Sequence, residues 1–178
     1  MRSGPSGRIE VLSTGRLRVT TWLPSDYADL RALHSDPLVM RHMRSGVESA
    51  AETRARLDRF LREQVELGWT KWRLEDADRR LVGRAGFNLD GSDLADGQWR
   101  ELGYVLAPGL WGLGLATEVA GALVGWHRAH PDPRLHAGLC AYAFAENGAS
   151  RRVLEKVGFT LVGEEWRSGV PQVRYELA

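Results

Sequence analysis

The spacing of apolar residues changes several times along the first half of the chain. Residues 17–22 alternate between apolar and polar side chains and precede a proline, which predicts a short strand at the edge of a sheet. Residues 25–36 then show helical spacing, and a short helix is expected over 38–43. In residues 48–67 the apolar positions form a single stripe among charged residues, which predicts an amphipathic helix.

The second half of the chain alternates between strand-like and helix-like segments. Three strand-like runs, 69–75, 80–89 and 98–106, follow one another with turn-forming residues between them. Residues 116–130 predict a helix that ends before a proline, and the apolar run 135–143 predicts a buried strand.

The C-terminal part of the chain predicts one more helix and two final strands. Helical spacing covers 147–157 and a glycine follows it, while the strands are expected over 160–166 and 172–177. This order of elements predicts a mixed α/β fold, in which a sheet of about seven strands is flanked by about four helices.

Composition and charge narrow the classes of protein that fit. The 178 residues, 43% hydrophobic and 26% charged, suit a single domain over 16–178 that follows a flexible N-terminal tail over 1–15. A net charge of +1 gives no strong field, so neither nucleic acid nor a membrane surface is expected as a partner. The single cysteine excludes an intrachain disulfide and no run has the length of a signal peptide or membrane span, so a cytoplasmic protein is expected.

Three glycines stand within six residues in the stretch GLWGLGLATEVA, at Gly109, Gly112 and Gly114. Glycine loses more backbone freedom on folding than any other residue, so such a cluster indicates that the backbone must approach something closely. A strand, a glycine loop and a helix in this order form an anion site, because the first N–H groups of the helix and the positive end of its dipole point at the loop.

The neighbours of these glycines discriminate between possible anions. The spacing of Gly109 and Gly114 matches a nucleoside-triphosphate loop, but Leu115 and Ala116 stand where that site needs Lys and Ser or Thr. A dinucleotide-binding motif needs a third glycine where Thr117 stands. What remains is a pyrophosphate held by backbone amides alone, and coenzyme A offers one.

The loop belongs to a longer pattern. Residues 101–118, followed by AENGASRRVLEKVGF at 145–159, resemble the GNAT superfamily of acetyl-CoA-dependent N-acetyltransferases, in particular the branch with the ribosomal-protein N-terminal acetyltransferases. Residues 17–43 resemble the N-terminal region of that branch. One departure is Trp111, which stands where the superfamily loop has Gln or Arg; its backbone amide is expected to serve instead.

The resemblance implies a fold and a set of cofactor contacts. In this family the fourth and fifth strands splay apart and the pantetheine arm of acetyl-CoA pairs with the fourth strand, here at Val105, Leu106 and Ala107. Asn147 would hydrogen-bond the pantetheine, although its position is also that of a helix N-cap, and that alternative stays open. The amides expected to bind the pyrophosphate are those of Trp111, Gly112, Leu113, Gly114, Leu115, Ala116 and Thr117.

Two side chains are candidates for proton transfer. Glu101 shares a strand face with Val105, because side chains alternate with a period of two, and is the candidate base, directly or through water. The alternative for Glu101 is an exposed strand carboxylate paired with an arginine. Ser150 is the candidate proton donor to the leaving thiolate, with Tyr104 and Tyr142 as alternatives.

The expected activity is transfer of the acetyl group of acetyl-CoA to a primary amine by direct attack in a ternary complex. The amine belongs to a peptide or protein N-terminus or to a small molecule, and the protein is a monomer or a homodimer. No metal is expected, because the histidines show no metal-ligand spacing with carboxylates. Two alternatives stay open: a non-catalytic CoA-binding or regulatory module, and transfer of an acyl group other than acetyl.

Overall fold

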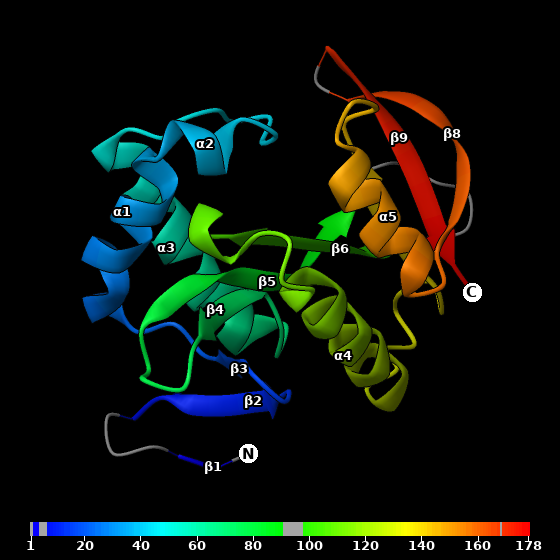
Figure 1. The fold of residues 1–178 in the computed structure, drawn as a ribbon. Coiled ribbons are helices and arrows are strands. Elements are labelled where there is room, and N and C mark those ends of the chain that lie inside the picture. The colour runs from blue at the N-terminus through cyan, green and yellow to red at the C-terminus, as the bar shows by residue number, and fades with distance from the viewer. Residues whose placement is uncertain (1, 4–6, 91–97, 168) are drawn as a thin grey trace. The chain divides into compact units, whose positions relative to one another are not determined.

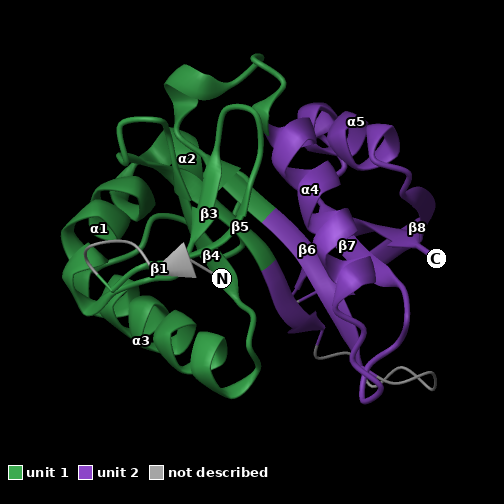
Figure 2. Ribbon diagram, turned by 90° about the horizontal axis from the view of Figure 1, so that it is seen from below, with its two compact units in different colours: residues 1–86, 104–115 green, residues 87–103, 116–178 purple. Residues whose placement is uncertain are grey.

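A computed structural model describes residues 2–3, 7–90, 98–167 and 169–178 (Figure 1). It has the mixed α/β fold that the sequence predicts, with the described strands in the sheet order β1-β2-β3-β4-β5-β6-β7-β9-β8. The chain forms two compact units (Figure 2). Unit 1 comprises residues 1–86 and 104–115, and unit 2 comprises 87–103 and 116–178.

Unit 1 contains the N-terminal strands and helices. Each of its strands pairs antiparallel with the next one along the chain. The strands are β1 (Arg2–Ser3), β2 (Ile9–Ser13), β3 (Arg18–Thr20), β4 (Lys71–Glu75) and the first part of β5 (Leu81–Asp90). The helices are η1 (Pro24–Asp26), α1 (Tyr27–Ser35), α2 (Pro37–Met40), α3 (Ala50–Glu66) and η2 (Pro108–Leu110).

The amphipathic helix expected over 48–67 is confirmed as α3. Ser49 and Glu52 form a reciprocal capping box, in which the Ser49 Oγ accepts from the Glu52 amide and the Glu52 carboxylate accepts from the Ser49 amide. The apolar stripe contributes Leu57 and Phe60, both fully buried, and the Phe60 ring stacks on Trp22 with 5.7 Å between centroids. The stripe therefore packs into the core of unit 1.

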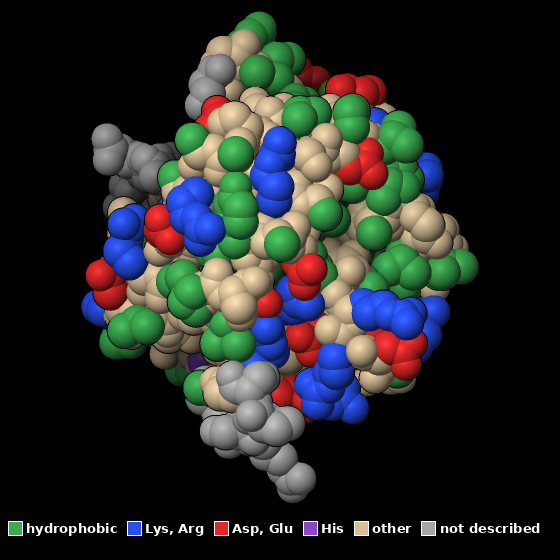
Figure 3. Space-filling model, turned by 90° about the vertical axis from the view of Figure 1, so that its left-hand side faces the viewer, with side chains coloured by type: hydrophobic (Ala, Val, Ile, Leu, Met, Phe, Trp, Pro, Cys, Tyr) green, Lys and Arg blue, Asp and Glu red, His purple; other side chains and the backbone are tan. Residues whose placement is uncertain are grey.

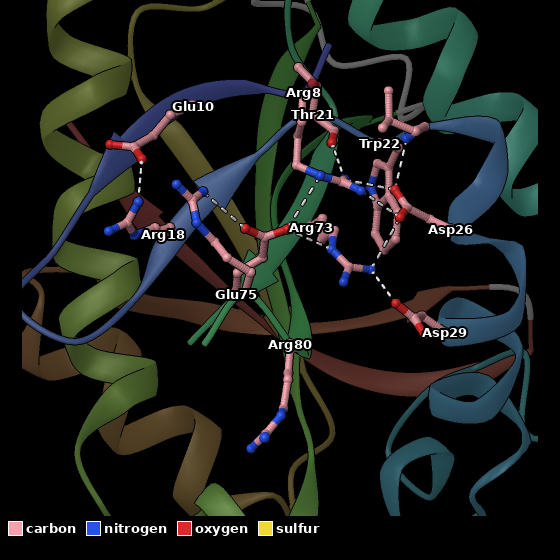
Figure 4. Close-up of polar contacts among 12 residues, drawn as sticks. Arg8, Glu10, Arg18, Thr21, Trp22, Asp26, Asp29, Arg73, Glu75 and Arg80 are labelled. Atoms are coloured by element: carbon pink, nitrogen blue, oxygen red, sulfur yellow. Dashed lines mark hydrogen bonds and ion pairs between the residues drawn. The ribbon is translucent and has the colours of Figure 1, made fainter. Parts of the chain in front are cut away.

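The N-terminal segment differs from the flexible tail expected over 1–15. Residues Ile9–Ser13 form β2 and pair with β3, so that β3 lies between β2 and β4 and is not an edge strand. Figure 4 shows what anchors this segment: Arg8 donates two hydrogen bonds to the Asp26 carboxylate, at 2.7 and 2.8 Å. Its Nε also lies 3.3 Å from Glu75, a buried carboxylate on β4. These contacts join residues far apart in sequence, which is why the local pattern did not indicate them.

Unit 2 contains the C-terminal strands and two helices. Residues 99–103 of strand β6 (Trp99–Leu106) belong to this unit and run parallel to β7 (Leu139–Ala143), with a register of three pairs, from Arg100 and Leu139 to Leu102 and Ala141. The remaining elements are α4 (Leu115–Ala129), α5 (Gly148–Lys156), β8 (Thr160–Arg167) and β9 (Val170–Leu177), and β9 pairs antiparallel with both β7 and β8.

Charges of both signs are mixed on the surface. On the face in Figure 3, Lys and Arg side chains lie among Asp and Glu side chains, in agreement with a net charge of +1. None of the described helices has both the length and the apolar character needed to cross a membrane.

A buried histidine in unit 1 is held between two charged side chains. The Nε of Arg84 donates to His34 Nε2 at 2.9 Å, and His34 Nδ1 lies 2.8 Å from a carboxylate oxygen of Glu48. The ring is therefore neutral, with its proton on Nδ1 and donated to Glu48. Burial, reinforced by the Arg84 charge, lowers the pKa of His34 to about 4.

This histidine makes the stability of the protein depend on pH. Because the pKa of His34 is lower in the folded chain than in the unfolded one, the unfolded chain takes up a proton first as the pH falls from about 6.5. The free energy of unfolding should fall by roughly 2–3 kcal/mol between about pH 6.5 and pH 4. His34→Gln, which keeps a donor and an acceptor but does not titrate, should flatten this part of the curve in urea unfolding measured across that range. The exposed His130→Gln serves as a control, and an unchanged slope in His34→Gln would contradict the neutral ring.

Candidate active site

The glycine loop lies in unit 1 between β6 and α4. Residues Trp111–Gly114 are all exposed, and Gly112 and Gly114 have φ angles of +77° and +78°. Side chains other than hydrogen rarely tolerate this left-handed conformation, so these two glycines are required by the backbone itself. A Cβ added at Gly109 or Gly112 would meet nothing within 4 Å, which leaves open space in front of the loop.

The loop leads directly into the first turn of α4, which starts at Leu115. The first four N–H groups of a helix have no partner within the helix, and the helix dipole makes this end positive. A loop that exposes its backbone and continues into a helix N-terminus fits a phosphate or pyrophosphate group. The geometry thus agrees with the anion site that the spacing predicts, and its ligand stays a prediction.

Trp111 has a structural explanation that the sequence did not provide. Its backbone amide donates to Pro108 O at 3.1 Å, so this N–H is already used, in contrast to the expectation that it serves the cofactor. Its indole Nε1 donates to Leu106 O at 2.9 Å, and the Arg41 guanidinium lies 5.0 Å from the ring centroid. The tryptophan at the polar position of the motif therefore fastens the loop to the end of β6.

The edge expected to pair with pantetheine is well anchored in unit 1. Val105 and Leu106 are buried, and Val105 packs into a cluster with Leu33, Val39 and Met40. The amide of Ala107 donates to Val82 O on β5.

Asn147 caps the last helix, as one of its two interpretations predicts. Its Oδ1 accepts from the amide of Ser150 at 3.1 Å, and this bond starts α5. Arg151, from the same turn, donates to the hydroxyl of Tyr175 and to Ala145 O. The roles of Asn147 in pantetheine binding and of Ser150 as a proton donor stay predictions.

Glu101 is paired with an arginine in unit 2. Arg167 Nη1 donates to Glu101 Oε2 at 3.2 Å, and its Nη2 donates to Asp90 Oδ1 at 2.7 Å. The guanidinium also lies 3.7 Å from the centroid of the Tyr142 ring. Burial alone would lower the pKa of Arg167, but the Glu101 and Asp90 carboxylates together raise it. Glu101 is therefore paired with an arginine, as its alternative interpretation proposes, but its side chain is only 14% exposed and belongs to an ionic cluster.

Asp90 is the centre of that cluster, and the sequence did not predict this role, because Asp90 follows the run 80–89 where turn-forming residues are expected. It is fully buried, and its Oδ2 accepts from the Tyr142 hydroxyl at 3.0 Å and lies 3.7 Å from Arg174 Nη1. Burial, with Asp90 close by, raises the pKa of the Cys140 thiol and of Tyr142 well above their usual ranges. Cys140 is thus a protonated, buried thiol and not an activated nucleophile.

The sequence pattern also places the chain in a family. A family model described as an acetyltransferase (GNAT) domain matches residues 16–160, a span that runs through both units. The chain belongs to the GNAT acetyltransferase family. The GNAT resemblance on the loop and last helix is thereby confirmed.

Solved structures of other GNAT proteins share the fold. A GNAT-family acetyltransferase of Bordetella pertussis is 20% identical, with a TM-score of 0.79 over 96% of this chain and 100% of the other. RimL, a ribosomal L7/L12 α-N-protein acetyltransferase in complex with coenzyme A, is 18% identical, with a TM-score of 0.74 over 95% and 97%. The aminoglycoside acetyltransferase AAC(6')-Ib in complex with coenzyme A is 20% identical, with a TM-score of 0.72 over 91% and 93%.

The ionic cluster of unit 2 predicts how substitutions at its centre act. Asp90→Asn removes a buried charge that faces two arginines, so the free energy of unfolding should fall by about 3 kcal/mol. Glu165→Gln is a matched control, because Glu165 pairs with Arg174 at 3.3 Å but is more than a third exposed, and it should cost less than about 1 kcal/mol. Urea unfolding of both variants measures the difference, and equal losses would contradict a central role for Asp90.

Proposed function

We propose that this GNAT protein transfers the acetyl group of acetyl-CoA to a primary amine by direct attack in a ternary complex. The observation that carries the proposal is the exposed loop at Gly112 and Gly114, with its left-handed backbone, open space and continuation into α4. Two proteins of the same fold support it by their descriptions, since RimL and AAC(6')-Ib are acetyltransferases in complex with coenzyme A.

In this proposal the amides from Gly112 to Thr117 bind the pyrophosphate of acetyl-CoA. The Trp111 amide is left out, because it donates to Pro108 O. The Ala107 amide is left out for the same reason, because it donates to Val82 O, and the pantetheine amides pair with the remaining backbone groups of the β6 edge at Val105–Ala107. Asn147 uses Oδ1 for the helix cap and offers the two N–H groups of its side-chain amide to the pantetheine.

The reaction forms one C–N bond and breaks one C–S bond. The lone pair of the amine attacks the thioester carbonyl carbon, and backbone N–H groups can stabilise the charge on its oxygen. Glu101 takes the proton that the amine loses, directly or through water, and the hydroxyl of Ser150 gives a proton to the leaving thiolate. Arg167 fixes the orientation of the Glu101 carboxylate during this step.

The free energy needed to deprotonate the amine, and so the importance of a base, depends on the type of acceptor. An α-amino group with a pKa near 8 is about a tenth neutral at pH 7, whereas deprotonating a lysine amine costs about 4–5 kcal/mol. An α-amino acceptor therefore makes the smaller demand on a base. We therefore propose α-amino groups of peptides or proteins as the first acceptors to test, with small-molecule amines as the second.

Calorimetry with acetyl-CoA, and thiol release with a panel of peptides, lysine derivatives and polyamines, test the proposal. Binding together with amine-dependent thiol release is expected. Absence of acetyl-CoA binding would sink the proposal. Tight binding without acetylation of any amine would instead favour the non-catalytic CoA-binding module.

A substitution in the loop tests the pyrophosphate site. Gly114→Val forces a branched side chain into a left-handed conformation and should reduce acetyl-CoA affinity at least about tenfold. Gly109→Ala is the matched control in the same loop, because Gly109 has open space and needs no left-handed backbone, and it should bind normally. Calorimetry measures both, and normal binding by Gly114→Val would argue against the loop.

A second substitution tests the base. With the best acceptor of the panel, Glu101→Gln should lower kcat near pH 7, by about 100-fold for a lysine-type amine and by less for an α-amino group. The loss should be smaller near pH 9, where more of the amine is already neutral. Glu164→Gln, an exposed carboxylate on β8, is the control and should behave as the unsubstituted protein. Thiol release across this pH range gives the comparison; activity unchanged at every pH would remove Glu101 from the mechanism.

A further inference from the structure

Arg16 comes from a turn far from the glycine loop in sequence. The turn joins β2 to β3 and is shaped by Thr14, whose amide donates to Leu17 O at 2.8 Å and whose Oγ1 accepts from the Leu17 amide at 3.0 Å. Arg16 lies within this turn and its side chain is exposed. These two hydrogen bonds fix the backbone of the turn and with it the position of the Arg16 Cα.

From there the guanidinium of Arg16 reaches the glycine loop within unit 1. Its Nη1 donates to Leu113 O at 2.8 Å, across 97 positions of sequence. Its Nη2 lies 3.7 Å from the point that a Cβ on Gly114 would occupy. Arg16 therefore contacts the loop at the peptide between Leu113 and Gly114.

The geometry of that peptide gives the contact a directional consequence. None of the described peptide bonds is cis, and the C=O and N–H of a trans peptide point in opposite directions. When Arg16 holds the carbonyl of Leu113, the N–H of Gly114 must point away from Arg16. Glycine has the widest choice of backbone conformations. Without the hydrogen bond from Arg16, the peptide between Leu113 and Gly114 would therefore be freer to rotate.

We infer that Arg16 is a positioning residue for the pyrophosphate loop, which it holds with the Gly114 N–H already turned outward for binding. The inference rests on the proposed function, because it names the side chain that prepares the same loop. A hydrogen bond from a charged donor to the carbonyl also polarises the peptide, which makes the N–H on its other side a stronger donor. Arg16 acts through the loop and contacts no phosphate.

Arg16→Gln, Arg16→Lys and Arg18→Gln form a matched set. Arg18 lies two positions later on β3, where its guanidinium pairs with Glu10 at 3.5 Å. Arg16→Gln should raise the dissociation constant of CoA and the KM for acetyl-CoA about tenfold, as expected for one hydrogen bond to a charged group, with kcat unchanged. Arg16→Lys should recover part of the loss, and Arg18→Gln should bind as the unsubstituted protein does.

A shortened acetyl donor distinguishes a loss of pyrophosphate binding from a general loss of activity in the Arg16→Gln variant. Acetyl-pantetheine lacks the pyrophosphate, so Arg16→Gln should leave its KM unchanged; an equal loss with this donor, or normal CoA affinity, would overturn the inference. The Arg16→Gln effect should persist in 0.5 M salt, roughly five times the ionic strength at which charges are screened over 10 Å. A loss that disappears in this salt would point to direct phosphate contact and overturn positioning. Failure of the unsubstituted protein to bind CoA would reject the proposed function itself, which is a separate result.

Discussion

The left-handed backbone at Gly112 and Gly114 is the constraint on which the candidate site depends. It lets the chain turn between β6 and α4 with its N–H groups exposed, but it also leaves a short loop with much conformational freedom. Side chains on both sides of the glycines offset that freedom. Trp111 ties the start of the loop to Leu106 O, and Arg16 ties its end at Leu113 O. Two side-chain contacts to carbonyl groups thus hold the loop, and one of the two side chains, that of Arg16, comes from outside the glycine motif.

The sequence predicted the secondary-structure elements that are specified by residues close to one another in the chain. The capping box at Ser49 and the apolar stripe behind it specify α3 within one stretch of sequence, and the spacing of glycines specifies the loop. The contacts that the sequence did not predict join residues far apart along the chain. Strand β2 is anchored by Arg8 on Asp26, and the loop is held by Arg16 from 97 positions away. A single sequence carries no local signal for such pairs, because Arg8, Asp26 and Arg16 each resemble an ordinary surface charge and a backbone carbonyl such as that of Leu113 has no sequence signature.

Both units place charges in their interiors, and in each case the charge is shared among several partners. Glu48 receives hydrogen bonds from Arg56 and from the neutral ring of His34, and Asp90 receives them from Arg167 and Tyr142. Removing a charge from water is costly, and only several well-aligned donors offset that cost. Such clusters therefore constrain the positions of the elements that carry them more than they raise overall stability.

The cluster around Asp90 also joins structure to the proposed chemistry. Arg167 binds Asp90 and Glu101 through different nitrogens, so the orientation of the candidate base depends on the buried Asp90 carboxylate as well. Strand β8 supplies the arginine and β6 supplies Glu101. The hairpin of β8 and β9, which the sequence presents only as the closing part of the sheet, therefore supplies the arginine that orients the candidate base of the proposed function.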